Sequence, residues 1–204
     1  MTLPSINQIY VASHSPRRRQ LLKQFRINFE MRPVSIDETM EKGETPVDYV
    51  CRMARAKAEM GWLRLIQRGL PLRPLLAAAT VVVLKGKVIG KPDNLVQGRK
   101  MLSTLSGQTH KVLTAVTVVA KNKIEESLST TTIKFRDINQ SEITSYLNGS
   151  EWNDRAGSYE IQGKAAVFII KISGSYSGAL GLPIFETAQL LEKFNIKVFH
   201  HPDK

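Results

Sequence analysis

The amino-acid sequence predicts an α/β fold in one domain over residues 1–204, and three observations carry this prediction. Short apolar runs typical of strands alternate along the chain with amphipathic segments typical of helices. The 204 residues, 42% of them hydrophobic, are enough to build one buried core. No internal repeat and no long Pro/Gly/Ser linker divides the sequence.

In the N-terminal half, helix starts are marked by a capping residue followed by proline. Ser15-Pro16 is one such pair, and Thr45-Pro46 is another, with Asp48 placed as in a capping box. The elements we expect are a strand over 8–13, a helix from Pro16 to about Phe25, a strand over 27–34, a helix from Pro46 to about Leu65, and a hairpin of 75–84 with Val88-Ile89.

In the C-terminal half, Asn139 and Glu142 are spaced as a capping box. The near-continuous apolar run 165–172 is typical of a central strand. The elements we expect are a helix over 93–105, antiparallel strands over 111–120 and 127–135, a helix from 139 to Leu147, the strand 165–172, a helix over 183–194 with Phe185, Ala188, Leu191 and Phe194 inward, and an edge strand over 197–200.

Several classes of protein are excluded by composition. The longest nearly apolar stretch, 75–84, is too short to cross a bilayer, and the N-terminus lacks the basic-then-apolar pattern of a signal peptide. The single cysteine, Cys51, cannot form an internal disulfide. We therefore expect a cytoplasmic protein without a membrane partner, and a homodimer is compatible with the sequence.

Positive charge is concentrated in the first half of the chain. The whole chain has 29 basic and 18 acidic residues, a net charge of +11, and residues 1–100 hold 18 of the basic and 8 of the acidic ones. This asymmetry indicates an anionic partner, and nucleic acid, a nucleotide polyphosphate and a membrane surface all satisfy it. Nucleic acid is the weakest of these, because no binding signature appears and no aromatic residues interleave with the basic ones.

Three arginines, Arg17, Arg18 and Arg19, occupy the first turn of the first expected helix. The helix dipole disfavours cations there by about 0.3–1 kcal/mol each, and the free N–H groups of the same turn favour a phosphate. A bound polyphosphate would explain the pattern, and a solvated basic helix explains it equally well. Without ligand, replacing Arg17 and Arg18 by alanine is expected to leave stability intact or slightly improved.

Several segments in order resemble signatures of the Maf family of nucleoside triphosphate pyrophosphatases. The opening signature corresponds to 11–18 with Leu21-Leu22. The others, in chain order, are 49–58, Gly90-Lys91-Pro92-Asp93, Met101-Leu102, Leu105-Ser106-Gly107, His110-Lys111-Val112, 156–165 and Gly181-Leu182-Pro183. Together they span nearly the whole chain.

The resemblance implies both a fold and a reaction. The fold would be inosine triphosphatase-like, with a mixed, twisted sheet flanked by helices. The reaction would be hydrolysis between the α- and β-phosphates of a nucleoside triphosphate, with a divalent cation, Mg²⁺ or Mn²⁺. Ile161-Gln162-Gly163 resembles the branch that acts on dTTP and UTP.

The resemblance also assigns roles to residues. Arg17, Arg18, Lys57 and Lys91 would bind phosphates, Thr80 and Gln162 would bear on the base, and Ser13 would contact substrate. Lys57 also follows Val50 and Ala54 at helical spacing, which places it on the inward face of its helix. Glu38, beside Asp37, stands at the family's acidic position and would hold the metal ion.

One position departs from the family pattern. Ala79 stands where the family has the aspartate taken as its proton acceptor. A methyl group neither accepts a proton nor binds a metal, and losing a general base costs about 10²–10⁴-fold in rate. Replacement of that base by Asp37 or Asp93 has no support in the sequence. Two alternatives therefore stay open: a pyrophosphatase with impaired activity, and a non-catalytic nucleotide-binding protein that regulates cell division.

Overall fold

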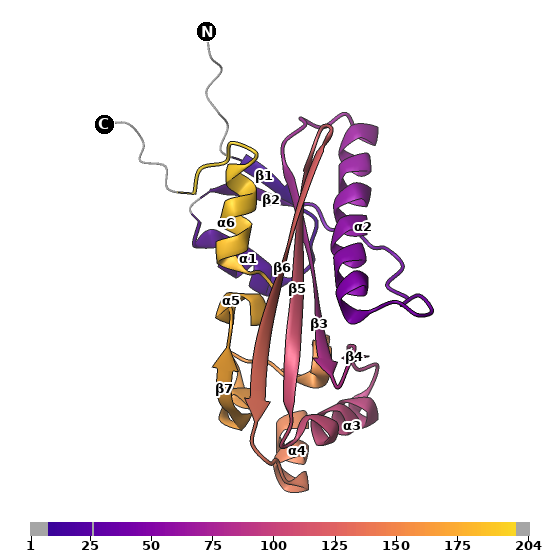
Figure 1. Ribbon diagram of the computed structural model, residues 1–204, viewed down its shortest axis with the longest axis vertical. Helices are drawn as coiled ribbons and strands as arrows, with labels where there is room; N and C mark the ends of the chain where they lie inside the picture. The colour runs from indigo at the N-terminus through magenta and orange to yellow at the C-terminus, as the bar shows by residue number, and fades with distance from the viewer. Residues whose placement is uncertain (1–7, 26, 199–204) are drawn as a thin grey trace, which may run out of the picture.

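Seven strands form one mixed sheet with helices on both faces (Figure 1), so the α/β prediction is confirmed. The computed structural model describes residues 8–25 and 27–198. The strands are β1 Gln8–Val11, β2 Asn28–Met31, β3 Leu75–Leu84, β4 Lys87–Ile89, β5 Thr109–Ala120, β6 Lys123–Phe135 and β7 Ile169–Ser173. The helices are α1 Pro16–Lys23, α2 Pro46–Gln67, α3 Leu95–Leu105, α4 Gln140–Leu147, α5 Tyr176–Ala179 and α6 Ile184–Glu192, with short 3₁₀ turns η1 Ala156–Ser158 and η2 Lys164–Phe168.

The strand order is β2-β1-β3-β5-β6-β7, and β4 pairs with β3. The first three strands of this order run parallel, with α1 as the crossover between β1 and β2. The remaining neighbours are antiparallel, including the long pair β5 and β6 that was expected. The mixture follows from connection length, since a crossover helix allows parallel pairing and the short β5–β6 turn allows only antiparallel pairing.

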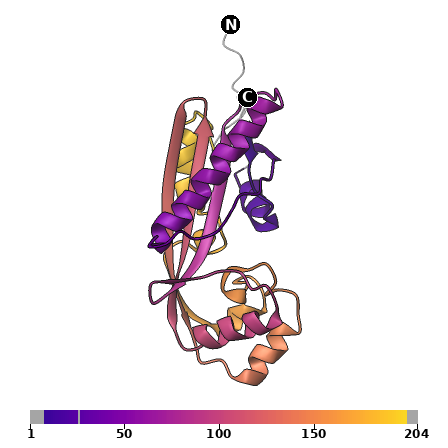
Figure 2. The ribbon, with the colours of Figure 1, turned by 90° about the vertical axis from the view of Figure 1, so that its right-hand side faces the viewer.

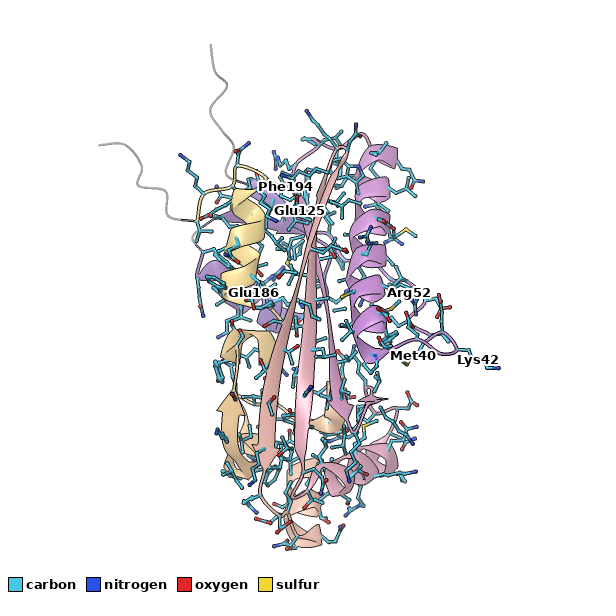
Figure 3. The ribbon with its side chains drawn as sticks, in the orientation of Figure 1. Met40, Lys42, Arg52, Glu125, Glu186 and Phe194 are labelled. Carbon is cyan, nitrogen blue, oxygen red and sulfur yellow. The ribbon has the colours of Figure 1, made fainter. Side chains whose placement is uncertain are left out.

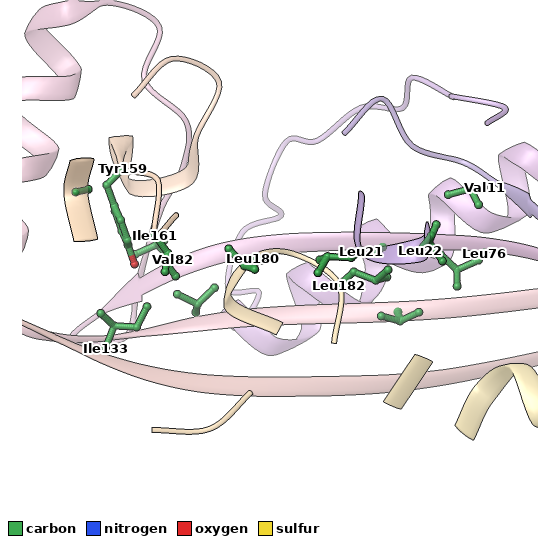
Figure 4. Packing of buried hydrophobic residues seen from close by; sticks show 14 of the residues in the cluster. Val11, Leu21, Leu22, Leu76, Val82, Ile133, Tyr159, Ile161, Leu180 and Leu182 are labelled. Carbon is green, nitrogen blue, oxygen red and sulfur yellow. The ribbon is translucent and has the colours of Figure 1, made fainter. Parts of the chain in front are cut away.

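The sheet is covered on both faces, which explains the continuous apolar run of β3. Tyr49, Val50 and Met53 of α2 pack on one face against alternate residues of β3 and β5. The other face packs against α1, α6 and the segment around Tyr159 (Figure 4). Along β3 only Thr80 is partly exposed. In a strand that is otherwise buried on both faces, the partial exposure of Thr80 marks the place where the packing over the sheet is interrupted.

The edge of β3 explains the interruption. β1 pairs with β3 at Leu75 and Leu76 and then ends, and β4 pairs with β3 from Val82 onward. Within the described residues, 77–81 is therefore paired on one side alone, with β5. An opening forms beyond the carboxyl end of β1, which is where ligands bind in open α/β sheets.

The predicted strand over 165–172 is confirmed only over 169–172, and its predicted central place in the sheet is wrong. Residues 164–168 form the 3₁₀ turn η2, and the strand that follows, β7, lies at the sheet edge, paired with β6 alone among the described strands. Ala165 and Phe168 are buried, whereas Val167 and Ile170 are exposed. A spacing of three between buried residues suits a helical turn, and a short apolar run does not distinguish this from a strand.

The last helix lies where it was predicted, but its buried side differs in part from the predicted one. Thr187, Leu190 and Leu191 are its buried residues, whereas the side chain of Phe185 is 69% exposed. Phe185 precedes Leu190 by five residues and so lies off the inward stripe. Residues 197 and 198 form no strand, and the rest of the predicted edge strand, 199–200, lies outside the described residues.

Helix caps follow the predicted signals in most of their details. The side chain of Asn139 accepts from the backbone of Glu142 and the Glu142 carboxylate accepts from the backbone of Asn139, a complete capping box. Thr45 accepts from the backbone N–H of Asp48, but the Asp48 carboxylate accepts from the Thr45 hydroxyl instead of closing the box. Across residues 8–25 and 27–198, no helix combines the length and the apolarity needed to cross a membrane.

A buried histidine predicts how stability depends on pH. His110 lies under Phe135 and Tyr159, with its Nε2 2.7 Å from the Tyr159 hydroxyl. Burial lowers the pKa of His110 to about 4. As the pH falls below about 6.5, His110 takes up a proton in the unfolded chain but not in the folded one. Stability therefore decreases from about pH 6.5 to about pH 4, where the folded chain takes up the proton as well.

We expect the free energy of unfolding of the wild-type chain to fall by about 3 kcal/mol between pH 7 and pH 4 because of His110. Urea unfolding at several pH values measures this loss, and the variant His110→Leu should lack most of it. Equal pH dependence of the two proteins would contradict the prediction.

Candidate functional site

A cavity of about 230 Å³ opens at the unpaired edge of β3, beyond the carboxyl end of β1. It brings together most of the residues to which the sequence assigned a role. Those lining it are Ser13, Arg17, Arg18, Glu38, Lys57, Ala79, Thr80 and Lys91. They come from the β1–α1 turn and α1, from the loop before α2, from α2 itself, from β3, and from the turn after β4. Figure 2 shows α1 and α2 toward one end of the sheet and α3 and α4 at the other.

Arg18 is a partly buried cation of this cavity. Its guanidinium donates to the backbone oxygen of Gly181 at 2.7 Å, to Ser13 Oγ at 3.2 Å and to Thr80 Oγ1 at 3.2 Å. All three acceptors are neutral, and burial lowers the pKa of Arg18 to about 10. Arg18 is therefore charged at neutral pH without a carboxylate in direct contact, a setting that favours an incoming anion.

Thr80 links this arginine to the sheet. Its Oγ1 lies 2.9 Å from Thr114 Oγ1, and the Thr114 hydroxyl donates to the backbone oxygen of Gly178 at 2.8 Å. Because the proton of Thr114 is used there, Thr80 donates to Thr114 and accepts from Arg18. The orientation of Arg18 is thus set by β3, β5 and the segment 178–181.

Arg17 lies in an ion-pair cluster that the sequence did not reveal. Its Nε is 2.8 Å from Glu160, whose other carboxylate oxygen is 3.3 Å from Arg155. Burial lowers the pKa of Arg17, and the charge of Arg155 lowers it further. Glu160 falls within the segment 156–165 that resembles the family, but no local signal pairs it with a residue more than a hundred positions away.

Lys57 projects from α2 into the cavity, as its helical spacing predicted. Its Nζ lies 2.7 Å from Glu38, and the two side chains are 15% and 51% exposed. Burial lowers the pKa of Lys57, while the Glu38 carboxylate acts in the opposite direction. Glu38 is therefore the accessible member of the pair and can turn toward a ligand at little cost.

The loop that carries Glu38 is fastened to α2 by Arg52. The Arg52 guanidinium donates to both carboxylate oxygens of Glu44, at 2.6 and 2.7 Å, and to the backbone oxygen of Thr39 at 3.0 Å. Figure 3 shows Arg52 beside this loop, with Met40 and Lys42 on its projecting part. Arg52 holds the loop in place while Glu38 stays half-exposed.

Positive charge dominates the lining of the cavity. Of the described residues that line it, five carry a positive charge, namely Arg17, Arg18, Lys57, Lys91 and Arg155, and two carry a carboxylate, Glu38 and Asp154. Asp154 pairs with Lys91 at 2.6 Å, and both side chains are exposed. Burial lowers the pKa of Arg17, Arg18 and Lys57. Glu160 pairs with Arg17 and Glu38 pairs with Lys57, so among the described residues Arg18 is the member of this set without an ion-pair partner. A polyanion would supply the negative charge that Arg18 lacks.

Comparison with known proteins bears on what that anion is. The sequence profile of a family described as Maf-like protein matches residues 8–194. The chain belongs to the Maf family. A dTTP/UTP pyrophosphatase of Nitrosomonas europaea is 52% identical over 207 residues, covering 98% of this chain and 100% of that protein. A dTTP/UTP pyrophosphatase of Chromobacterium violaceum is 44% identical over 191 residues, covering 94% and 96%.

A solved structure with a weaker likeness is that of the Staphylococcus aureus Ham1 protein. It is 14% identical, with a TM-score of 0.44, and the match covers 63% of this chain and 71% of that one.

Ala79 lines the cavity from β3, is 5% exposed, and packs in the cluster that contains Tyr49, Met53 and Ala115. The two alternative acids do not replace the missing group. Asp37 accepts from the backbone of Thr39, Asp93 accepts from Gln97, and neither lines the cavity.

Gln162 and Arg19 are not brought to the cavity. Both side chains are exposed, and neither residue lines it, whereas the neighbouring Ile161 and Tyr159 do. Contact between Gln162 and a base in this Maf-family cavity would require the turn 161–163 to move inward. Arg19 points away because successive residues on a helix are 100° apart.

The donors for a metal ion are few. Within 8–25 and 27–198, no group of three His, Cys, Asp or Glu side chains is placed to hold an ion. Glu38 faces the cavity, but it is engaged by Lys57. This donor set does not fit an ion held by the protein alone. It fits Mg²⁺ or Mn²⁺ bound mainly by phosphate oxygens and water, with one carboxylate added.

Proposed function

We propose that this chain is a nucleoside triphosphate pyrophosphatase that binds dTTP and UTP and cleaves them to the monophosphate and pyrophosphate. One observation carries the proposal: three cations whose pKa values are lowered by burial, Arg17, Arg18 and Lys57, meet in one cavity beside the edge of β3. The choice of dTTP and UTP rests on the relatives, whose names specify these two nucleotides.

In the proposed complex the triphosphate lies between the start of α1 and Lys57. The first turn of α1 offers the backbone N–H of Arg17 and the positive end of the helix dipole, since Pro16 has no N–H and those of Arg18 and Arg19 donate to Ser15. Arg18 already has its orientation fixed by Ser13, Thr80 and Gly181, so little reorganisation accompanies binding. Lys91, which also lines the cavity, would exchange Asp154 for a phosphate oxygen.

Glu38 is the residue we propose for the divalent cation, which when bound neutralises charge on the phosphates. Lys57 would then release Glu38 and turn to the triphosphate, because the incoming phosphates replace the charge of the carboxylate. Gln162 and Thr80 are proposed to recognise the pyrimidine base. A side-chain amide offers a donor and an acceptor to the imide edge of thymine or uracil.

Ala79 limits the rate in this proposal. The chain positions the phosphates but holds no carboxylate at the place where the family presents its proton acceptor. Water would attack without a positioned base, about 10²–10⁴-fold more slowly than with one. The same observation favours a second candidate function, a nucleotide-binding protein that does not turn over its ligand.

Pyrophosphate release from a panel of nucleoside triphosphates, with Mg²⁺ or Mn²⁺, tests the proposal, and calorimetry on the same panel measures binding. We expect dTTP and UTP to be bound and slowly hydrolysed in preference to purine triphosphates. Tight binding of dTTP with no release above the rate without protein would favour the second candidate. Equal, weak binding of all nucleotides would overturn both.

The variant Gln162→Leu tests how the base is read. In the proposed complex the turn 161–163 moves inward and encloses Gln162 against the base. Loss of its hydrogen bond there costs about 1–3 kcal/mol, so discrimination between pyrimidines and purines should fall about ten-fold or more. Affinity for pyrophosphate itself should not change, which serves as the internal control. An unchanged ranking of the four bases would remove Gln162 from base recognition.

A further inference from the structure

A second cavity, of about 220 Å³, lies between the C-terminal end of α2 and the segment that follows β2. Three of the residues that line it are arginines, Arg32, Arg64 and Arg68. The other described residues that line it are Met31, Pro33, Val34, Gly61, Leu65 and Leu70, and none of these carries a carboxylate. Nothing in the proposed reaction uses these arginines.

The arginines of the second cavity are short of partners. Arg64 and Arg68 form no ion pair with any residue in the described part of the chain. Arg32 pairs through Nη2 with Glu30, but its Nε is buried without a hydrogen-bond partner there. A buried donor without an acceptor carries a free-energy cost that a bound acceptor would remove.

Helix electrostatics explain only part of this arrangement. Arg64 and Arg68 stand four residues apart on one face of the last turns of α2, where the helix dipole favours cations but the two charges repel each other. Arg32 comes from a different element, after the end of β2, and gains nothing from that dipole. Three arginines from two elements line this one cavity, and guanidinium groups suit an anion with several oxygens.

We propose that this second cavity binds a phosphoryl anion, with inorganic phosphate and pyrophosphate as the simplest members of the class. Guanidinium forks match the oxygens of such a group. The proposal does not rest on the pyrophosphatase function. The two cavities share one wall residue, Val34, so binding must be followed separately at each.

Backbone-amide NMR of the full chain tests the proposal, with pyrophosphate titrated at an ionic strength held constant by sodium chloride. Gly69 and Leu70, at the end of α2, report on the second cavity, and Arg17 reports on the first. We expect saturable shifts at Gly69 and Leu70. The double variant Arg64→Gln with Arg68→Gln should weaken that binding about ten-fold for each charge-assisted hydrogen bond lost, and leave the titration at Arg17 unchanged.

The matched control removes the same charge elsewhere. Arg99→Gln with Lys100→Gln lies on α3, which Figure 1 places at the other end of the molecule from the end of α2. This variant should titrate at Gly69 as the wild type does. Arg68→Gln alone, a change of an exposed side chain, replaces the double variant if the latter does not fold.

Titrations with phosphate and with dTMP distinguish the sources of the phosphoryl group. Either one saturating the shift at Gly69 supports the site, and tighter binding of dTMP would show that Leu65 and Leu70 contact the nucleoside. The absence of a saturable shift at Gly69 would overturn the proposal, and so would equal weakening of binding in the α3 control. Displacement of pyrophosphate by a short DNA duplex, with amide shifts spread over the basic residues of the chain, would also overturn it.

Discussion

The variant Ala79→Asp is expected to release pyrophosphate from dTTP at least about 100-fold faster than the wild-type chain, the lower end of the gain from a positioned general base. The methyl group of Ala79 lines the cavity that holds Arg17, Arg18, Lys57 and Glu38, so a carboxylate there would lie beside the phosphates. Together with Glu38 it would offer the divalent cation a second carboxylate ligand. The gain in rate should therefore depend on that cation. The measurement is single-turnover pyrophosphate release with and without Mg²⁺.

The matched control is Ala79→Asn, which has the size of aspartate but neither its charge nor its basicity. It should stay as slow as the wild type. Ala79→Asp should also have a lower melting temperature without ligand, because the carboxylate enters a cluster containing Tyr49 and Met53. A folded Ala79→Asp protein that binds dTTP but gains no activity would contradict the pyrophosphatase proposal and favour the binding protein.

Replacing Arg18 by methionine is expected to weaken dTTP binding at least ten-fold, since a charge-assisted hydrogen bond contributes about 1.5–3 kcal/mol. Calorimetry measures this loss. Arg19→Met is the control, because Arg19 is the next residue of α1 and its exposed side chain does not line the cavity. Equal effects of the two substitutions would show that overall charge, and not the position of Arg18, governs binding.

Arg18→Met should also destabilise the ligand-free protein, contrary to the expectation from helix electrostatics alone. The pKa of Arg18 is lowered from 12.5 to about 10, which means that burying its charged form costs about 3 kcal/mol. Three hydrogen bonds from the charged group, to Gly181, Ser13 and Thr80, contribute about 1.5–3 kcal/mol each and outweigh it. We expect urea unfolding to show a net loss of about 1.5–6 kcal/mol in the free energy of unfolding, and unchanged stability would refute this account of Arg18.

Much of the fold could be predicted from local patterns. The strand β3, the hairpin to β4, the capping box at Asn139 and the helix that starts at Pro46 all confirm sequence signals that act over a few residues. The run 165–172 could not be assigned this way. Its apolar residues satisfy either a strand or a helical turn, and the packing of Ala165 and Phe168 into the core decides between them.

The candidate site divides along the same line. The basic start of α1, the inward place of Lys57 and the lack of a carboxylate at position 79 are properties of the sequence itself. That Arg18 donates to Gly181, 163 residues away, and that Glu160 lies between Arg17 and Arg155, was decided by the tertiary structure. Partners so distant in the chain leave no periodic or local signal.

By itself, then, the sequence determined which chemical groups stand at which positions, such as three arginines at the start of the first helix and a methyl group at position 79. Only the tertiary structure decided which cations are buried, which have partners, and which line one cavity from separate elements, as Arg32 and Arg64 do. The physical reason is that local structure depends on neighbours a few residues apart, whereas burial and charge pairing depend on contacts across the whole chain.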